Sequence, residues 1–219
     1  MARGAGLVVG EQAVQIPAGR VRLDGNLTVP EGAPGVVLFA HGSGSSRFSP
    51  RNTFVARVLQ EGGLGTLLFD LLTEGEALDR AKVFDIDLLA QRLLAATDWL
   101  QEQMLQEGMG LGYFGASTGA AAALQAAALR GPAIRAIVSR GGRPDLAEAY
   151  LSRVTAPTLL IVGERDPLVI ELNEAAYGAL QTEKDLVIIP GATHLFEEPG
   201  ALEQVAELAR NWFQRYLGG

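Results

Sequence analysis

Short runs of consecutive apolar residues recur along the chain, and longer amphipathic stretches separate them. Each run is continuous, without alternating polar positions, which is typical of a strand buried on both faces of a parallel sheet. Six such runs occupy residues 36–40, 66–69, 111–114, 134–138, 158–162 and 186–189. We therefore expect at least six strands in a mostly parallel sheet.

The stretches between these runs have the three- and four-residue apolar spacing of helices. The first helix is expected to begin at its cap, Ser49, and to end at Gly62. Further helices are expected over residues 86–104, 120–129, 169–180 and 202–216. Residues 7–16 and 21–29 instead have the pattern of antiparallel edge strands around a turn at 17–19. The sequence thus predicts an α/β fold with helices on both faces of the sheet.

Composition narrows the class of protein. The chain has 219 residues and is 48% hydrophobic, and no linker or repeat divides it, so we expect a single domain over residues 1–219. With 25 acidic and 18 basic residues its net charge is −7, and we see none of the clustered positive charge of a nucleic-acid-binding protein. No apolar run reaches the roughly 18 residues of a membrane helix. Residues 1–10 lack the apolar segment of a secretory signal, so a cytoplasmic location is expected.

Residue types missing from the chain also limit its chemistry. It has no cysteine, which excludes disulfides, iron–sulfur clusters and thiolate zinc sites. The two histidines, His41 and His194, leave little room for a histidine-built metal centre. Any histidine-dependent reaction must use one of these two side chains.

Residues 115–119, with the sequence Gly-Ala-Ser-Thr-Gly, follow a predicted strand and precede a predicted helix. A serine on such a sharp strand-to-helix turn is held in a strained conformation, and glycines two residues before and after it let neighbouring backbone approach. The helix N-terminus that follows can stabilise developing negative charge. Ser117 is therefore the candidate nucleophile. An overlapping dinucleotide-type glycine pattern at 110–115 is disfavoured, because it spans the strand instead of following it.

A serine nucleophile needs a base and an orienting carboxylate. His194 follows the last predicted strand, and Asp166 follows the strand before it, so both would lie at the carboxyl edge of the sheet with Ser117. The order serine, aspartate, histidine is that of the α/β-hydrolases. Glu164, two residues before Asp166, is the rival acid. Asp166 is preferred, because Pro167 biases it toward an extended conformation and begins the next predicted helix, which holds Asp166 rigidly. His41 is expected to be a structural hydrogen-bonding residue.

The loop at residues 41–47, His-Gly-Ser-Gly-Ser-Ser-Arg, begins where another predicted strand ends. In an α/β-hydrolase, the loop at this place supplies one oxyanion-binding amide, and the residue after the nucleophile supplies the other. The backbone N–H groups of Ser43 and Thr118 are the candidates. A phosphate-binding loop is the competing interpretation, although the segment lacks the Gly-Lys-Ser/Thr ending of that motif.

The segments 41–47, 115–119, 163–166 and 191–194 resemble those of the α/β-hydrolase superfamily, in particular its small branch similar to dienelactone hydrolase. The resemblance extends from about residue 20 to the C-terminus. It implies a serine hydrolase with no metal and no organic cofactor. Dienelactone hydrolases use a cysteine nucleophile, which this chain lacks, so a carboxylesterase acting on a small-molecule ester is expected. Thioester hydrolysis or acyl transfer by the same triad is the alternative, and a non-catalytic binding protein with this fold is a further one.

The segments after the strands bear on the substrate. A short helix is expected at once after residues 139–143, which leaves no room for the lid that many α/β-hydrolases insert there, so the site should be open and shallow. Arg47 and Arg140 are candidates for binding an anionic substrate group, with Arg51 and Arg143 nearby. Ion pairing of these arginines with Glu74, Glu76 or Glu164 at the rim is the favoured alternative.

Overall fold

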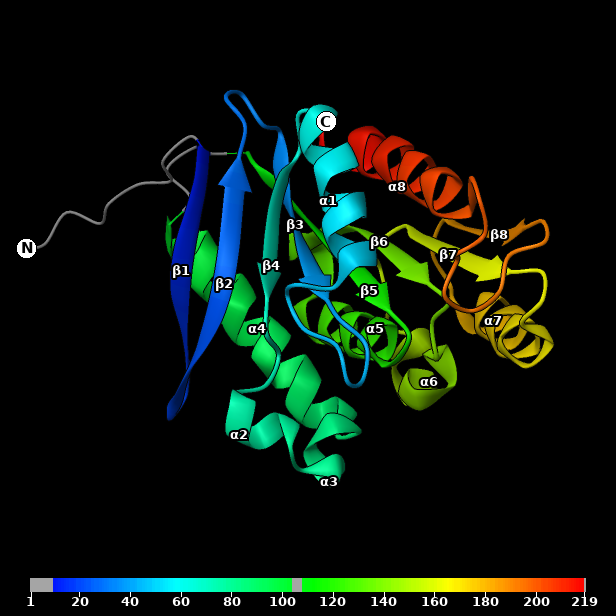
Figure 1. The fold of residues 1–219 in the computed structure, drawn as a ribbon, viewed down its shortest axis with the longest axis horizontal. Helices are drawn as coiled ribbons and strands as arrows, with labels where there is room; N and C mark the ends of the chain where they lie inside the picture. The colour runs from blue at the N-terminus through cyan, green and yellow to red at the C-terminus, as the bar shows by residue number, and fades with distance from the viewer. Residues whose placement is uncertain (1–9, 104–107, 219) are drawn as a thin grey trace, which may run out of the picture.

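A computed structural model describes residues 10–103 and 108–218 and forms a twisted sheet with helices on both faces (Figure 1). The strands are β1 (Gly10–Ala18), β2 (Val21–Val29), β3 (Gly35–Ala40), β4 (Gly65–Phe69), β5 (Gly110–Ala116), β6 (Ile134–Arg140), β7 (Thr158–Gly163) and β8 (Lys184–Ile189). The helices are α1 (Pro50–Glu61), α2 (Glu74–Ala77), α3 (Arg80–Val83), α4 (Ile86–Gln103), α5 (Thr118–Arg130), α6 (Glu148–Leu151), α7 (Pro167–Ala179) and α8 (Ala201–Leu217), with 3-10 turns at Gly131–Ala133 and Pro144–Ala147.

The strand order in the described part of the chain is β1-β2-β4-β3-β5-β6-β7-β8. Strands β3 to β8 pair in parallel, whereas β1 and β2 pair antiparallel with each other and β2 pairs antiparallel with β4. Every residue of β3, β4, β5 and β7 is buried, as the continuous apolar runs indicate. The predicted α/β fold with antiparallel N-terminal strands is confirmed.

The N-terminal strand pair differs slightly from the expectation. β1 continues through Pro17 to Ala18, and the turn lies at residues 19–20, where Gly19 has a φ of 66°. Pro17 is tolerated inside β1 because an edge strand leaves one row of backbone positions without a ladder partner. Residues 1–9 lie outside the described residues. They include the start of the strand expected at 7–16 and all but the last residue of the segment 1–10, for which no secretory signal was expected. The end of the helix expected at 86–104 also lies outside the described residues.

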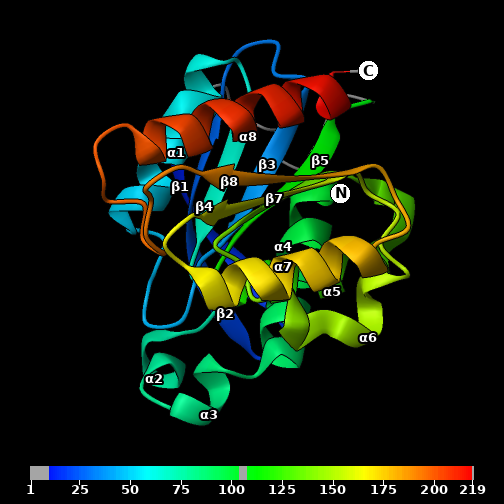
Figure 2. The ribbon, with the colours of Figure 1, turned by 90° about the vertical axis from the view of Figure 1, so that its right-hand side faces the viewer.

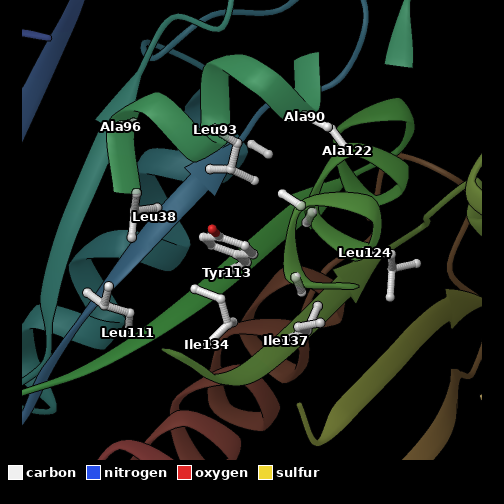
Figure 3. Close-up of a cluster of buried hydrophobic side chains, with 14 of the residues drawn as sticks. Leu38, Ala90, Leu93, Ala96, Leu111, Tyr113, Ala122, Leu124, Ile134 and Ile137 are labelled. Atoms are coloured by element: carbon white, nitrogen blue, oxygen red, sulfur yellow. The ribbon is translucent and has the colours of Figure 1, made fainter. Parts of the chain in front are cut away.

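Two hydrophobic layers hold the helices against the sheet. Helices α1 and α8 pack together on one face, and α4, α5 and α7 cover the other (Figure 2). Figure 3 shows part of the layer between the sheet and α4 and α5, in which the ring of Tyr113 from β5 lies among aliphatic side chains. Burial raises the pKa of the Tyr113 phenol, and its oxygen lies 2.6 Å from the Thr97 hydroxyl of α4, so its polar end has a partner.

The carboxyl ends of β3, β5, β6, β7 and β8 meet at one edge of the sheet, where the segments that follow them come together. Short helices and turns follow β4 and β6, and no separate cap domain covers this edge in the described part of the chain, as expected (Figure 1). The short helices α2 and α3 lie in the segment after β4 and were not expected from the sequence. Among the described residues, no helix is long and apolar enough to cross a membrane.

Candidate active site

Ser117 stands on the turn between β5 and α5 with φ 52° and ψ −121°, a backbone conformation that residues with a side chain rarely adopt. Two glycines make this turn possible. A Cβ on Gly115 would lie 2.4 Å from the Ala120 Cα, and one on Gly119 would lie 2.1 Å from the Ala40 carbonyl oxygen. The glycine spacing of the motif is therefore required by close backbone packing on both sides of the serine.

Asp166 and His194 come together from the ends of two neighbouring strands, β7 and β8. The His194 Nδ1 lies 2.6 Å from the Asp166 Oδ2, the length of a charge-assisted hydrogen bond. With Nδ1–H donating to the carboxylate, Nε2 carries the lone pair that a general base needs. Phe196, buried two residues further on, anchors the His194 loop in the core.

Glu164 does not take part in this pair. Its side chain is exposed, and its Oε2 accepts a hydrogen bond from the Gly191 N–H at 2.7 Å. That contact fixes the turn after β8, which carries His194. Of these two carboxylates, the structure brings Asp166, the preferred acid, to the imidazole and Glu164 to the backbone.

The other histidine has both ring nitrogens engaged. The His41 Nε2 accepts a hydrogen bond from the Leu71 N–H at 3.0 Å, which leaves Nδ1 protonated and donating to the Gly42 carbonyl oxygen at 3.0 Å. Burial lowers the pKa of this imidazole, so the ring stays neutral. His41 ties the loop after β3 to the segment after β4, the structural role expected for it.

The loop after β3 approaches the nucleophile closely, since a Cβ on Gly42 would lie 3.2 Å from the Ser117 Cβ. Thr118 is the first residue of α5, where backbone N–H groups have no partner within the helix. The Ser43 N–H, however, donates to the Thr118 Oγ1 at 2.9 Å. The two candidate oxyanion-binding residues are thus adjacent, but a side chain already occupies one of the two amides.

Two cavities flank the loop after β3. One, of about 250 Å³, is lined by Ser117 and His194 together with residues of α1 and β6. The other, of about 460 Å³, lies on the far side of the loop and is bounded by Leu72 and Ala77 from the segment after β4. The expectation of an open, shallow site at Ser117 stays a prediction. The segment with α2 and α3 forms one wall of the larger cavity, and no periodic pattern in 4-residue helices could reveal it.

The rim arginines differ in their partners. Arg47 forms an ion pair with Asp70, and its backbone N–H also donates to that carboxylate. Arg143 donates to both carboxylate oxygens of Asp145 at 2.8 and 2.7 Å. Ion pairing at the rim was expected, but with Glu74, Glu76 or Glu164. The observed partners are Asp70 for Arg47, Asp145 for Arg143 and Glu197 for Arg51.

Arg140, the last residue of β6, lies inside the smaller cavity beside Ser117. It is 8% exposed, and among the described residues its guanidinium group makes one side-chain hydrogen bond, from Nη2 to the Asn52 Oδ1 at 3.3 Å. Burial, and then the nearby positive charge of Arg51, lower its pKa to about 10. The two arginines expected to bind substrate therefore line different cavities. Arg47 is paired with a carboxylate, whereas Arg140 has no carboxylate partner among the described residues.

The strand order and the nucleophile turn are those of an α/β-hydrolase, and solved structures agree. A dienelactone hydrolase from Anabaena variabilis ATCC 29413 is 60% identical, with a TM-score of 0.91 over 94% of this chain and 97% of that protein. A Xanthomonas campestris α/β serine hydrolase described as having no lid has a TM-score of 0.77 at 22% identity over 96% of both chains, a likeness of fold alone.

The family follows from the sequence comparison. A model of the dienelactone hydrolase family matches residues 23–217, so the chain belongs to that family, and membership supports hydrolase activity. A Mycobacterium tuberculosis (strain H37Rv) protein provisionally named a phosphoribosyl transferase is 58% identical over 209 residues. That match covers 95% of this chain and 47% of the relative, so the chain spans about half the length of this curated relative.

Proposed function

We propose that the protein is a serine hydrolase that cleaves carboxylic esters through an acyl-enzyme intermediate. The observation that carries this proposal is the Asp166–His194 hydrogen bond at the cavity that Ser117 also lines. Nucleophile, base and orienting carboxylate then follow in the chain order of the α/β-hydrolases. A protein that only bound ligands would have no need for a strained serine beside an oriented imidazole.

In the first half of the reaction, the Ser117 Oγ attacks the ester carbonyl carbon while His194 takes the hydroxyl proton at Nε2. The tetrahedral intermediate collapses, the carbon–oxygen bond to the alcohol breaks, and His194 returns the proton to the leaving oxygen. In the second half a water molecule repeats the attack on the acyl-enzyme, which releases the acid and restores Ser117. Asp166 holds the imidazole in one tautomer throughout.

The negative charge on the carbonyl oxygen needs hydrogen-bond donors. The backbone N–H of Thr118, at the start of α5, is proposed as the first donor. The Ser43 N–H is proposed as the second, and for this role its hydrogen bond to the Thr118 Oγ1 must open or be shared with the oxyanion.

Two further activities are compatible with the same triad, thioester hydrolysis and acyl transfer, but no contact in the structure favours them over ester hydrolysis. Phosphoribosyl transfer, the activity in the provisional name of the M. tuberculosis relative, is not proposed for this chain. The name belongs to a protein of about twice this length, and the site described above has the parts of a hydrolase.

The experiment is a comparison of the wild-type protein with Ser117→Ala and His194→Ala. We expect hydrolysis of p-nitrophenyl acetate in the wild type, and a kcat lower by roughly 10⁴–10⁶-fold in each variant, since triad members act as a unit. A fluorophosphonate probe should add its phosphonyl group to the peptide containing Ser117, as read by mass spectrometry. Unlabelled Ser117, or full activity in Ser117→Ala, would contradict the proposal.

A further inference from the structure

The smaller cavity beside Ser117 is built at the N-terminus of helix α1. Ser49 caps this 12-residue helix, and Arg51 and Asn52 stand in its first turn. All three line the cavity, together with Arg140 from the end of β6. The N-terminus of a helix carries a partial positive charge of about half a unit, so the cavity is electropositive before any side chain is considered.

Arg140 adds a charge that the described residues do not neutralise. No carboxylate in the described part of the chain lies within 4.0 Å of its guanidinium. Its Nε and Nη1 are buried and lack a hydrogen-bond partner among those residues. Leaving a buried charge unpaired costs several kcal/mol, so proteins seldom keep one without a use.

A second buried arginine shows how this fold treats a guanidinium elsewhere. Arg92 of α4 is as buried as Arg140, at 8% exposed. It donates to the Glu76 Oε1 at 2.8 Å and to the Ala18 carbonyl oxygen at 2.8 Å. Arg140 has one long hydrogen bond to a neutral amide in place of these contacts. Among the described residues, the Nε of Arg92 is also buried without a partner, so Arg140 differs from Arg92 in two respects: it has no carboxylate partner, and its Nη1 is unpartnered as well.

Arg51 supplies a second, partly compensated charge. Its Nη1 lies 3.3 Å from the Glu197 Oε1, but that carboxylate is 65% exposed and so weakly coupled to it. The Arg51 Nε is buried without a hydrogen-bond partner among the described residues. The lining of the cavity contains these two guanidinium groups and no acidic residue.

We propose that this cavity is a phosphate subsite and that the ester substrate carries a phosphate monoester group, held by Arg140 and Arg51 at the N-terminus of α1. The inference rests on the proposed function, because it places the phosphate beside the ester that Ser117 attacks. The phosphate group itself is not cleaved. It stays on the alcohol or the acid that the hydrolysis releases.

Charge and donors favour phosphate over carboxylate. Arg140, Arg51 and the helix end together offer between about one and a half and two and a half positive charges, depending on how far Glu197 offsets Arg51. A phosphate monoester carries about −1.5 to −2 at pH 7 and three acceptor oxygens. Each guanidinium group has five N–H donors, and among the described residues Arg51 and Arg140 each use one nitrogen, for Glu197 and Asn52 respectively. A carboxylate has one charge and two oxygens, and would leave part of this set unsatisfied.

Direct binding of inorganic phosphate tests the subsite without any reaction. We would titrate phosphate into the wild type, Arg140→Met and the control Arg143→Met by calorimetry, with chloride at matched ionic strength as the blank. Arg143 is a matched control because it lies three residues away and is already paired with Asp145. We expect the Kd to rise at least tenfold in Arg140→Met and to stay within twofold in Arg143→Met. Equal Kd values in all three proteins would overturn the proposal.

A second measurement needs no variant. Phosphate should raise the Tm of the wild type above the value in chloride, because a ligand that binds the folded state stabilises it. Acetate serves as the carboxylate ligand for comparison and should bind at least tenfold more weakly than phosphate. Acetate binding as tight as phosphate would make this a carboxylate site and would overturn the commitment to phosphate.

Three matched esters connect binding with catalysis: 2-acetoxyethyl phosphate, 3-acetoxypropionate and neutral 2-methoxyethyl acetate. We expect kcat/KM for the phosphate ester to exceed that for the neutral ester at least tenfold in the wild type. This ratio should fall at least tenfold in Arg140→Met and stay within twofold in Arg143→Met. If the wild type hydrolysed the three esters with equal kcat/KM and Ser117→Ala hydrolysed none of them, the proposed subsite would be wrong but the proposed function would stand. Phosphate binding without hydrolysis of any ester would overturn the proposed function alone.

Discussion

Replacing Asp166 by asparagine tests the choice between Asp166 and Glu164 as the acid of the site. The side chain keeps its shape, but the carboxylate that lies 2.6 Å from the His194 Nδ1 loses its charge. An amide N–H facing Nδ1 would favour the tautomer with the proton on Nε2, which removes the lone pair that the base needs. We therefore expect kcat to fall by about 10⁴-fold.

The size of that loss corresponds to about 5.4 kcal/mol in transition-state free energy, at 1.36 kcal/mol per tenfold change. Glu164→Gln is the matched control, since it also neutralises a carboxylate of the same loop. The amide oxygen of glutamine can still accept from the Gly191 N–H, the contact that Glu164 makes. We expect its kcat to change by less than tenfold.

The assay is steady-state hydrolysis of p-nitrophenyl acetate at neutral pH, with the Tm of each variant measured to show that it is folded. Equal losses in the two variants, or a larger loss in Glu164→Gln, would refute the assignment of Asp166. A loss of under tenfold in a folded Asp166→Asn protein would refute the triad itself.

Two predictions concern stability. Because burial lowers the pKa of His41 below 6.5, the unfolded chain takes up a proton that the folded chain does not as the pH falls through 6.5. The wild-type Tm should therefore fall more steeply from pH 7 to pH 5 than the Tm of His41→Gln, a variant whose side-chain oxygen can still accept from the Leu71 N–H. If the difference in Tm between the two proteins did not change with pH, this prediction would be wrong. Gly119→Ala places a Cβ 2.1 Å from a carbonyl oxygen of β3 and should destabilise by about 3 kcal/mol or more, roughly 6–12 °C in Tm by calorimetry. The control Gly75→Ala meets no atom within 4 Å, and a Tm for Gly119→Ala equal to that of this control would refute the packing argument.

Much of the fold follows from local patterns. A strand buried on both faces admits apolar side chains at every position, so the runs at β3, β4, β5 and β7 predict their own burial. The nucleophile turn is likewise local, because Gly115, Ser117 and Gly119 lie within five residues and the backbone geometry between a strand and a helix dictates their spacing. Parallel pairing then brings the strand ends to one edge, which is why Asp166 and His194 could be expected near each other.

The pairing of charged side chains was decided by the tertiary structure. Asp166 and Glu164 stand two residues apart, and although Pro167 favours Asp166, the course of the loop after β8 determines which of them meets His194. Arg47 binds Asp70 from the end of a neighbouring strand, whereas Arg140 is buried with no carboxylate near it among the described residues. The reason is physical: periodicity records how each residue faces the core, but an ion pair depends on where two distant segments cross. The sequence therefore specified the sheet, the nucleophile turn and the preferred acid, whereas folding in three dimensions decided the partners of the arginines and left Arg140 without a carboxylate beside the serine.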